Sequence, residues 1–352
     1  MKKVILASVM FCSTLLALSG CQSMSNTSLS MSDSIVQTDT VEIPENKVMQ
    51  WSSGYNWQLS EVTRYDGQPI TIHVTDPIRL AIDPGSLHFY QGCNHDKIDL
   101  FTGAPPYSYA SYIVQLPATC TTSRPDDHNI RTLFQDYGTY LFGIKLLPTV
   151  PSTSQGNTFA APKRLALIME NGNQLVFTGM AKTLPAPTSL PINAELLKRY
   201  DWHLVSAVDN HYDDKGQLVS RKPIGNFYHS DWPISVTFRD DSDQTYVSFN
   251  SGCNGSGAPY FLLDDNTLKI GMIISTMMGC GETGNRIETA LFNLMRDSSS
   301  QLSLSLQSSE EISTSSKNQT DMPSYNLLQT MESGETLVWQ NQELPKRVYD
   351  TQ

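Results

Sequence analysis

Gly252-Cys253-Asn254 and Gly92-Cys93-Asn94 are two copies of one short motif, and each copy is followed at the same spacing by a second cysteine, Cys280 or Cys120. The chain holds only 6 cysteines, so chance does not account for this match. A repeated spacing indicates that one folding unit is used twice. We therefore predict two similar domains, each with a cysteine pair built into its architecture.

Matching segments also flank the two cysteine pairs. Trp57-Gln58-Leu59 precedes the first pair and Trp202-His203-Leu204 precedes the second, while residues 165–177 align without gaps with residues 327–339. We place the domains at residues 47–182 and 195–350, both of ordinary domain size. The segment between them, residues 183–194, contains Pro185, Pro187 and Pro191 and is predicted to be a stiff linker.

The beginning of the chain has the features of an export signal. Two lysines precede an apolar stretch, Val4 to Leu18, that is too short to cross a bilayer comfortably. Leu18-Ser19-Gly20-Cys21 looks like the bacterial lipobox, which predicts a signal peptide over residues 1–21 and a lipid on Cys21. Residues 22–46 are polar and predicted to be a flexible tether. The tether begins with Gln22 and not aspartate, which favours an outer-membrane lipoprotein facing the periplasm, with exposure on the cell surface left open.

The formal net charge of −11 is spread over a chain with few charged residues. Nucleic acids and anionic lipid surfaces are bound by basic patches, so this balance argues against both partners. We expect an exported protein with a polar, hydroxyl-rich surface.

Periodicity in the second copy predicts several short strands and one helix. Alternating or clustered β-formers occur at residues 234–238, 246–249, 260–263, 268–270 and 302–306, and residues 327–339 predict a closing hairpin. Residues 285–295 place apolar side chains at helical spacing, and residues 126–142 repeat this pattern in the first copy. We therefore predict an α+β fold with two tandem similar domains, each a largely antiparallel sheet with one main helix.

The cysteines take matching positions in this scheme, the first after a strand and the second before the helix. In an oxidising compartment such pairs indicate disulfides. Four cysteines allow three pairings, and the repeat favours Cys93–Cys120 with Cys253–Cys280. Each bond would stabilise its domain by roughly 3 to 4 kcal/mol in the chain-entropy model. The alternative is a pair of free, buried cysteines at adjacent core positions.

The second copy resembles the META domain family of HslJ-like bacterial lipoproteins over about residues 200–342. The resemblance rests on Gly252-Cys253-Asn254, on Ser275-Thr276-Met277-Met278-Gly279-Cys280, and on Glu288 with Leu291-Phe292. The first copy lacks the Ser-Thr-Met-Met element and resembles a degenerate META domain. The resemblance implies that Gly252, Cys253, Asn254, Thr276, Met278 and Cys280 form the family motif. It also implies a role in heat and envelope stress and in tolerance of novobiocin, without a defined biochemical activity.

The sequence gives little support for a catalytic or cofactor-binding motif. Gly279-Cys280-Gly281-Glu282-Thr283-Gly284 fits a dinucleotide fingerprint, but no glycines follow Cys120 in the first copy and no convincing βαβ unit follows the motif. We expect these glycines to let the backbone turn into the helix beside Cys280. Nucleophile and P-loop motifs are absent from the sequence, although a triad assembled in three dimensions stays open. We predict no enzyme activity, no catalytic residues, no cofactor and no resident metal.

These expectations favour a lipid-anchored, non-catalytic envelope protein that binds an unidentified envelope protein or supports the envelope under stress. One alternative is an inhibitor of a secreted hydrolase. Another is a metal-binding stress protein, for which the candidate ligands are Cys93, His95, Asp96, Cys120 and His128. Asn94 and Asn254 are expected to be turn residues whose side chains bond nearby backbone.

Overall fold

The computed structural model describes residues 45–100, 113–115, 129–138, 140–148, 162–184, 189–241, 244–307 and 323–344. Residues Ile43–Gln352 form one compact unit. Cys21, Cys120 and His128 lie outside the described residues, as do the predicted signal peptide and nearly all of the predicted tether.

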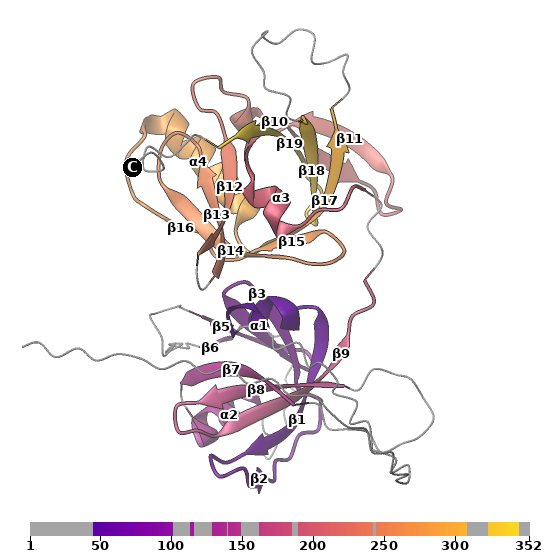
Figure 1. Cartoon of the computed structure of the whole chain (residues 1–352), viewed down its shortest axis with the longest axis vertical. Helices are drawn as coiled ribbons and strands as arrows, with labels where there is room; N and C mark the ends of the chain where they lie inside the picture. The colour runs from indigo at the N-terminus through magenta and orange to yellow at the C-terminus, as the bar shows by residue number, and fades with distance from the viewer. Residues whose placement is uncertain are drawn as a thin grey trace, which may run out of the picture. The chain divides into compact units, whose positions relative to one another are not determined.

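The first sheet is an open antiparallel sheet (Figure 1). Its strands are β1 (Tyr55–Thr63), β2 (Pro69–Ile70), β3 (Arg79–Asp83), β4 (Ser86–Gln91), β5 (Asn94–Asp99), β6 (Ile113–Gln115), β7 (Leu141–Leu147), β8 (Lys163–Met169) and β9 (Gln174–Ala181). They pair in the order β6-β5-β4-β3-β1-β9-β8-β7, with β2 on β1. Helices α1 (Glu45–Ser52) and α2 (Ile130–Tyr137) contribute Val48 and Leu133 to the same core.

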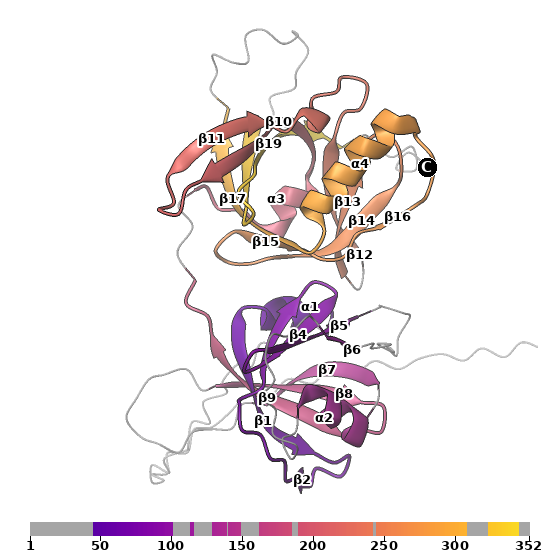
Figure 2. The same ribbon diagram turned by 180° about the vertical axis from the view of Figure 1, so that it is seen from behind.

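The second sheet closes into a barrel, because β10 pairs with both β12 and β19. Its strands are β10 (Tyr200–Tyr212), β11 (Leu218–Pro223), β12 (Ser235–Asp241), β13 (Gln244–Asn250), β14 (Ser256–Leu262), β15 (Thr267–Ile270), β16 (Ile274–Ser275), β17 (Ser298–Leu306), β18 (Tyr325–Met331) and β19 (Thr336–Glu343). Helix α3 (Ala194–Lys198) precedes the barrel, a short 3₁₀ helix covers Gly225–Phe227, and α4 (Gly281–Met295) lies across the barrel (Figure 2).

The two sheets share an order of pairing around their first strands. β1 pairs with β2, β3 and β9, and β10 pairs with β11, β12 and β19. A buried tryptophan begins each arrangement. The indole of Trp57 donates to the carbonyl of Ser52 at 2.7 Å, and the indole of Trp202 donates to the carbonyl of Leu197 at 3.0 Å. Each bond joins the first strand to the short helix before it, and sequence periodicity had predicted neither helix.

Helix α4 packs its apolar face into the barrel core. Its buried residues include Ile287, Leu291 and Met295, in agreement with the predicted face. The helix begins earlier than expected, directly after Cys280, because Gly281 adopts a positive φ of 72° and turns the chain into the first helical turn.

Helix α2 corrects the sequence prediction in the first copy. The predicted helix over residues 126–142 is wrong at its end, because Leu141 and Phe142 belong to β7. Gly138 ends the helix: its backbone N–H donates to the carbonyl of Phe134, and its φ of 154° leaves the helical region. The capping box of Asn129 and Thr132 fixes the helix start, where the Asn129 side chain accepts hydrogen bonds from two backbone N–H groups.

The antiparallel sheets confirm the predicted strand character of the fold. Strands dominate and helices are few, so the α+β prediction overstated the helical part and did not include a closed barrel. Closure pairs Tyr200 with Glu343, which are far apart in the sequence. No local sequence pattern predicts such a pairing. Among the described residues, no helix combines the length and apolar character needed to span a bilayer.

Candidate functional site

The motif residues of the second copy meet at one end of the barrel. Cys253 lies in the turn between β13 and β14, and Cys280 lies immediately before α4. The two residues form a disulfide with their Cα atoms 5.9 Å apart. The bond therefore ties a strand turn to the start of the helix, and the segment Thr276–Cys280 leads into it. We call this segment the methionine loop, after Met277 and Met278.

Asn254 joins the methionine loop to the helix. Its side-chain oxygen accepts hydrogen bonds from the backbone N–H of Met278 at 2.7 Å and from the hydroxyl of Thr276 at 2.9 Å. Its Nδ2 donates to Glu288 at 2.8 Å and to the carbonyl of Met278 at 3.2 Å. The predicted role of Asn254 as a local turn residue is therefore wrong, because its partners apart from the sulfur of neighbouring Cys253 lie more than 20 residues away along the chain.

Glu288 completes this arrangement from inside the barrel. The side chain is buried on α4, with 9% of its surface exposed, and it accepts hydrogen bonds at both carboxylate oxygens. The donors are the backbone N–H and the side-chain amide of one residue, Asn254, itself 5% exposed. Hydrogen bonds to a buried carboxylate are strong, and losing one leaves an unsatisfied group in the interior. The pair therefore holds the loop in one conformation.

The packing of one tryptophan explains why two positions at this end of the barrel are glycines. The ring of Trp232 lies 2.7 Å from the position that a Cβ of Gly284 would occupy, and 3.4 Å from that of Gly252. Gly252 also has a positive φ of 78°. Gly284 is therefore needed for the packing of Trp232, which gives this part of the glycine pattern a structural reason that needs no dinucleotide.

The methionine loop projects apolar side chains into solvent. Met277 is 99% exposed and Met278 is 59% exposed, and neighbouring Ile274 on β16 is 63% exposed. Large apolar side chains gathered on a surface mark interaction sites more often than isolated ones do. The structure thus combines exposed methionines with a backbone held by the disulfide and by Asn254. A loop held in this way loses little conformational entropy when it binds.

The first sheet arranges its corresponding residues differently. Cys93 is disulfide-bonded, and its predicted partner lies outside the described residues. Asp96 is buried and pairs with Arg131, whose Nε donates to it at 3.0 Å. The predicted metal ligands do not converge where they are described, because Cys93 and Asp96 are already engaged. His95 faces another side chain, His88, with Nδ1 of His88 and Nε2 of His95 2.9 Å apart.

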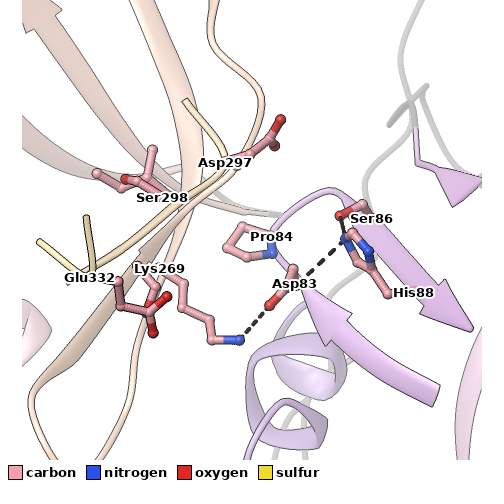
Figure 3. Close-up of a pocket in the computed structure, with 11 residues that line it drawn as sticks. Asp83, Pro84, Ser86, His88, Lys269, Asp297, Ser298 and Glu332 are labelled. Atoms are coloured by element: carbon pink, nitrogen blue, oxygen red, sulfur yellow. Dashed lines mark hydrogen bonds and ion pairs between the residues drawn. The ribbon is translucent and has the colours of Figure 1, made fainter. Parts of the chain in front are cut away.

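A pocket of about 230 Å³ lies beside His88 (Figure 3). Its lining residues are Asp83, Pro84, Ser86, His88, Lys269, Ile270, Gly271, Asp297, Ser298, Ser299 and Glu332. Within the pocket lining, Lys269 pairs with Asp83 at 2.5 Å. Burial lowers the pKa of His88, and the negative charge of Asp83 opposes this shift. Burial also lowers the pKa of His95, so burial disfavours the charged form of both rings.

Ser86, His88 and Asp83 contain the residue types of a catalytic triad but lack its geometry. The Ser86 hydroxyl lies 3.1 Å from Nε2 of His88, and the Asp83 carboxylate lies 3.6 Å from the same nitrogen. In a triad the histidine contacts the nucleophile through one nitrogen and the carboxylate through the other. Here the other nitrogen contacts His95, so no carboxylate orients the imidazole from the side opposite Ser86.

Comparison with known proteins gives a family match over part of the chain that forms the second sheet. Residues 195–320 match the META domain family, and the chain therefore contains a META domain. The match does not include residues 47–182, so the first domain as a degenerate copy stays a prediction. None of the curated proteins matches the chain.

Two solved structures show some similarity to the chain. One is the NMR structure of a protein from Burkholderia xenovorans, with 22% identity over 46% of this chain and 94% of that chain and a TM-score of 0.29. The other is the crystal structure of a protein of unknown function from the DUF3598 family of Nostoc punctiforme PCC 73102. It has 10% identity over 85% of this chain and 99% of that chain, with a TM-score of 0.19.

Sequence reasoning missed two contacts that organise these sites. Glu288 was recognised as part of the family signature, but nothing in a single sequence paired it with Asn254 on a different element. His95 was assigned to a candidate metal-ligand set that did not include His88. Their positions on consecutive strands joined by a tight turn were the available signal, because such a turn brings side chains of one face together.

Proposed function

We propose that the chain is a non-catalytic, lipid-anchored envelope protein whose META domain binds an envelope protein through the methionine loop. The exposure of Met277 and Met278 on a fixed backbone is the observation that supports this proposal most strongly. Methionine is adaptable and makes extensive apolar contacts, which suits it to a protein interface. Neighbouring Ile274 enlarges the same apolar surface.

The anchor is part of the same proposal. The lipobox resemblance at Cys21 supports lipidation, and the oxidised cysteines of the second domain are in keeping with an oxidising compartment. We place the protein at the outer membrane, facing the periplasm, where a partner of the methionine loop would be another exported protein.

The first domain is proposed to be a diverged copy of the second. The shared pairing order and the matching indole bonds of Trp57 and Trp202 support a common origin. The first domain lacks the methionine loop motif, so only the second domain is proposed to bind this partner.

A second candidate function is inhibition of a secreted hydrolase. The observation that favours it is the position of the methionine loop next to a disulfide, because inhibitory loops bind with little change of backbone conformation. In this case the partner would be an enzyme whose activity falls on binding. A purified partner would then be assayed for hydrolysis with and without the META domain protein.

The role in heat and envelope stress that the family resemblance implies is tested in a deletion strain of the native host. The strain is complemented with the wild-type gene, with the double variant Met277→Ser/Met278→Ser, or with Val219→Ser. Val219 is 63% exposed on β11 and provides the matched control. We expect wild type and Val219→Ser to restore growth under heat or novobiocin, and the double variant to fail at equal protein level. Full rescue by the double variant would contradict the role of the loop.

A further inference from the structure

Two histidines on neighbouring strands face each other on the first sheet. His88 is on β4 and His95 is on β5, and Tyr90 lies directly opposite His95 in the register of these strands. Because side chains alternate between the faces of a sheet, His88, Tyr90 and His95 share one face. Nδ1 of His88 and Nε2 of His95 are 2.9 Å apart, and both side chains are partly accessible to solvent.

Each ring is held from its outer side. Nε2 of His88 contacts the hydroxyl of Ser86 at 3.1 Å and the carboxylate of Asp83 at 3.6 Å (Figure 3). The ring of His95 stacks on the ring of Tyr90, with centroids 4.3 Å apart and planes 16° apart. His88 is thus oriented as histidines that bind metals usually are, with its outer nitrogen near a carboxylate and a hydroxyl.

We propose that His88 Nδ1 and His95 Nε2 form a binding site for a divalent late-transition-metal ion, and that the site binds Cu²⁺ more tightly than Zn²⁺. Imidazole nitrogen suits both ions, and the stability of complexes with a given ligand set is highest for Cu²⁺. Ser86 and Asp83 act as positioning residues that orient His88. This site differs from the ligand set predicted from the sequence, with which it shares only His95.

The separation of the two nitrogens suits a Cu²⁺ ion. Cu²⁺ prefers tetragonal coordination, and bonds of about 2.0 Å at roughly 90° place two neighbouring nitrogen ligands about 2.8 Å apart. His88 Nδ1 and His95 Nε2 are 2.9 Å apart. The ion lies to one side of the line between them, so each ring turns about its side-chain torsions until its nitrogen points at the ion. In the metal-free pair one facing nitrogen carries the proton of the hydrogen bond. If this is His88 Nδ1, binding moves that proton to Nε2, where Ser86 and Asp83 can accept it.

Other charges near the pair limit its affinity. Lys97 shares the face of His88 and His95 in the strand register and repels a cation. Its charge is offset by Asp99 at 2.9 Å and by Asp297 at 3.7 Å. Among the described residues no group of three or more His, Cys, Asp or Glu side chains can hold a metal, so water fills the remaining coordination positions. We therefore expect a reversible site and not a permanently loaded one.

The test uses the full chain purified without an affinity tag and with its disulfides intact. Cu²⁺ and Zn²⁺ are titrated calorimetrically in the presence of a weak competing chelator, and the Cu²⁺ complex is examined by EPR for nitrogen ligands. The variants are His88→Gln and His95→Gln. His203→Gln is the control, because Nε2 of His203 contacts the carboxylate of Asp201 at 3.1 Å and not a second histidine.

We expect one Cu²⁺ per chain at this site, two nitrogen ligands in the EPR spectrum, and weaker binding of Zn²⁺. Each single substitution of His88 or His95 should lower Cu²⁺ affinity by more than about tenfold, while His203→Gln leaves it unchanged. Unchanged Cu²⁺ binding in His95→Gln would overturn the proposal, as would an equal loss in His203→Gln. His95 is the less buried of the pair, so this variant decides the question even if His88→Gln does not fold.

Discussion

Glu288 on α4 binds Asn254 through both of its carboxylate oxygens, at 3.1 Å from the backbone nitrogen and at 2.8 Å from Nδ2. This relationship fixes the end of the barrel at which the methionine loop is exposed. It also gives the motif residue Asn254 a structural role, since its side-chain oxygen accepts hydrogen bonds from Thr276 and Met278.

The Asn254–Glu288 pair should contribute measurably to stability. Glu288→Gln replaces an acceptor oxygen with an NH₂ group that faces the donors of Asn254, so we expect a loss of about 1 to 3 kcal/mol in the free energy of unfolding. Glu282→Gln, at an exposed position in the first turn of the same helix, should cost less than about 1 kcal/mol. Urea denaturation measures both. Equal losses in the two variants would show that the buried hydrogen bonds of Glu288 contribute no more to stability than the exposed carboxylate of Glu282 does.

The disulfide of the second domain should stabilise it through the unfolded chain. Cys253→Ser/Cys280→Ser opens a loop with a sequence separation of 27 residues, which corresponds to roughly 3.5 kcal/mol in the chain-entropy model. Reduction of the wild-type protein also breaks the disulfide of Cys93, so its loss should be at least as large. Denaturant midpoints of oxidised wild type, reduced wild type and the double variant test this. If oxidised wild type and the double variant unfold at the same midpoint, the bond has no stabilising role.

Gly284 should not tolerate a side chain. A Cβ at this position would lie 2.7 Å from the ring of Trp232 and 2.8 Å from the Cβ of Cys280, so Gly284→Ala should cost about 1 to 3 kcal/mol despite the higher helix propensity of alanine. Gly279→Ala is the matched control, because nothing lies within 4 Å of its Cβ position. Thermal unfolding followed by tryptophan fluorescence compares them. A stable Gly284→Ala variant would mean that Trp232 is not packed as described.

Tyr260 should make the protein sensitive to alkali. Burial raises the pKa of its phenol in the folded chain, so the folded state keeps this proton to a higher pH than the unfolded state does. The contribution is therefore fully present below about pH 10 and is lost as the pH rises above it. The hydroxyl has no hydrogen-bond partner among the described residues, so Tyr260→Phe should not cost more than a few tenths of a kcal/mol at pH 7.

The alkaline unfolding midpoint provides the measurement. Circular dichroism between about pH 9 and pH 12 should place the midpoint of Tyr260→Phe above that of the wild type. An unchanged midpoint, or a lower one, would show that ionisation of Tyr260 does not drive the transition.

Lipidation of Cys21 should determine where the protein is found. Cys21→Ala removes the acceptor of the lipid, and a single short apolar signal cannot hold the mature chain in the bilayer. We expect the variant to move from the membrane fraction to the soluble periplasmic fraction, while Cys12→Ala, inside the signal, stays with the membranes. Membrane association of Cys21→Ala equal to that of wild type would remove the anchor from the account.

The residues that sequence reasoning placed correctly are those that carry a local pattern. Ile287 and Leu291 recur at helical spacing and lie on the buried face of α4, and the alternation of Leu302 and Leu304 with serine matches β17. The repeated spacing of Cys253 and Cys280 predicted that these two residues form a disulfide. Each of these signals is contained within a few neighbouring residues or within an exact repeat of the chain.

The features that were missed depend on contacts between distant segments. Barrel closure joins β10 to β19, and the Asn254–Glu288 pair joins a turn to a helix. The His88–His95 pair required the register of β4 on β5. A single sequence does not fix such pairings, because many registers satisfy the same alternation of apolar and polar residues. The sequence showed Met277 and Met278 within the segment that resembles the META family, but their exposure was seen only in the folded structure.

The proposed role of the methionine loop is tested most directly by site-specific photocrosslinking in the native envelope. A photoreactive phenylalanine analogue replaces Met277, or Val219 on β11 as the control, and covalent adducts are identified by mass spectrometry. Binding through the loop predicts one dominant adduct from position 277, none from position 219, and loss of that adduct when Met278→Ser is added. The same adducts from both positions, or no adduct from position 277 under heat or novobiocin stress, would contradict it.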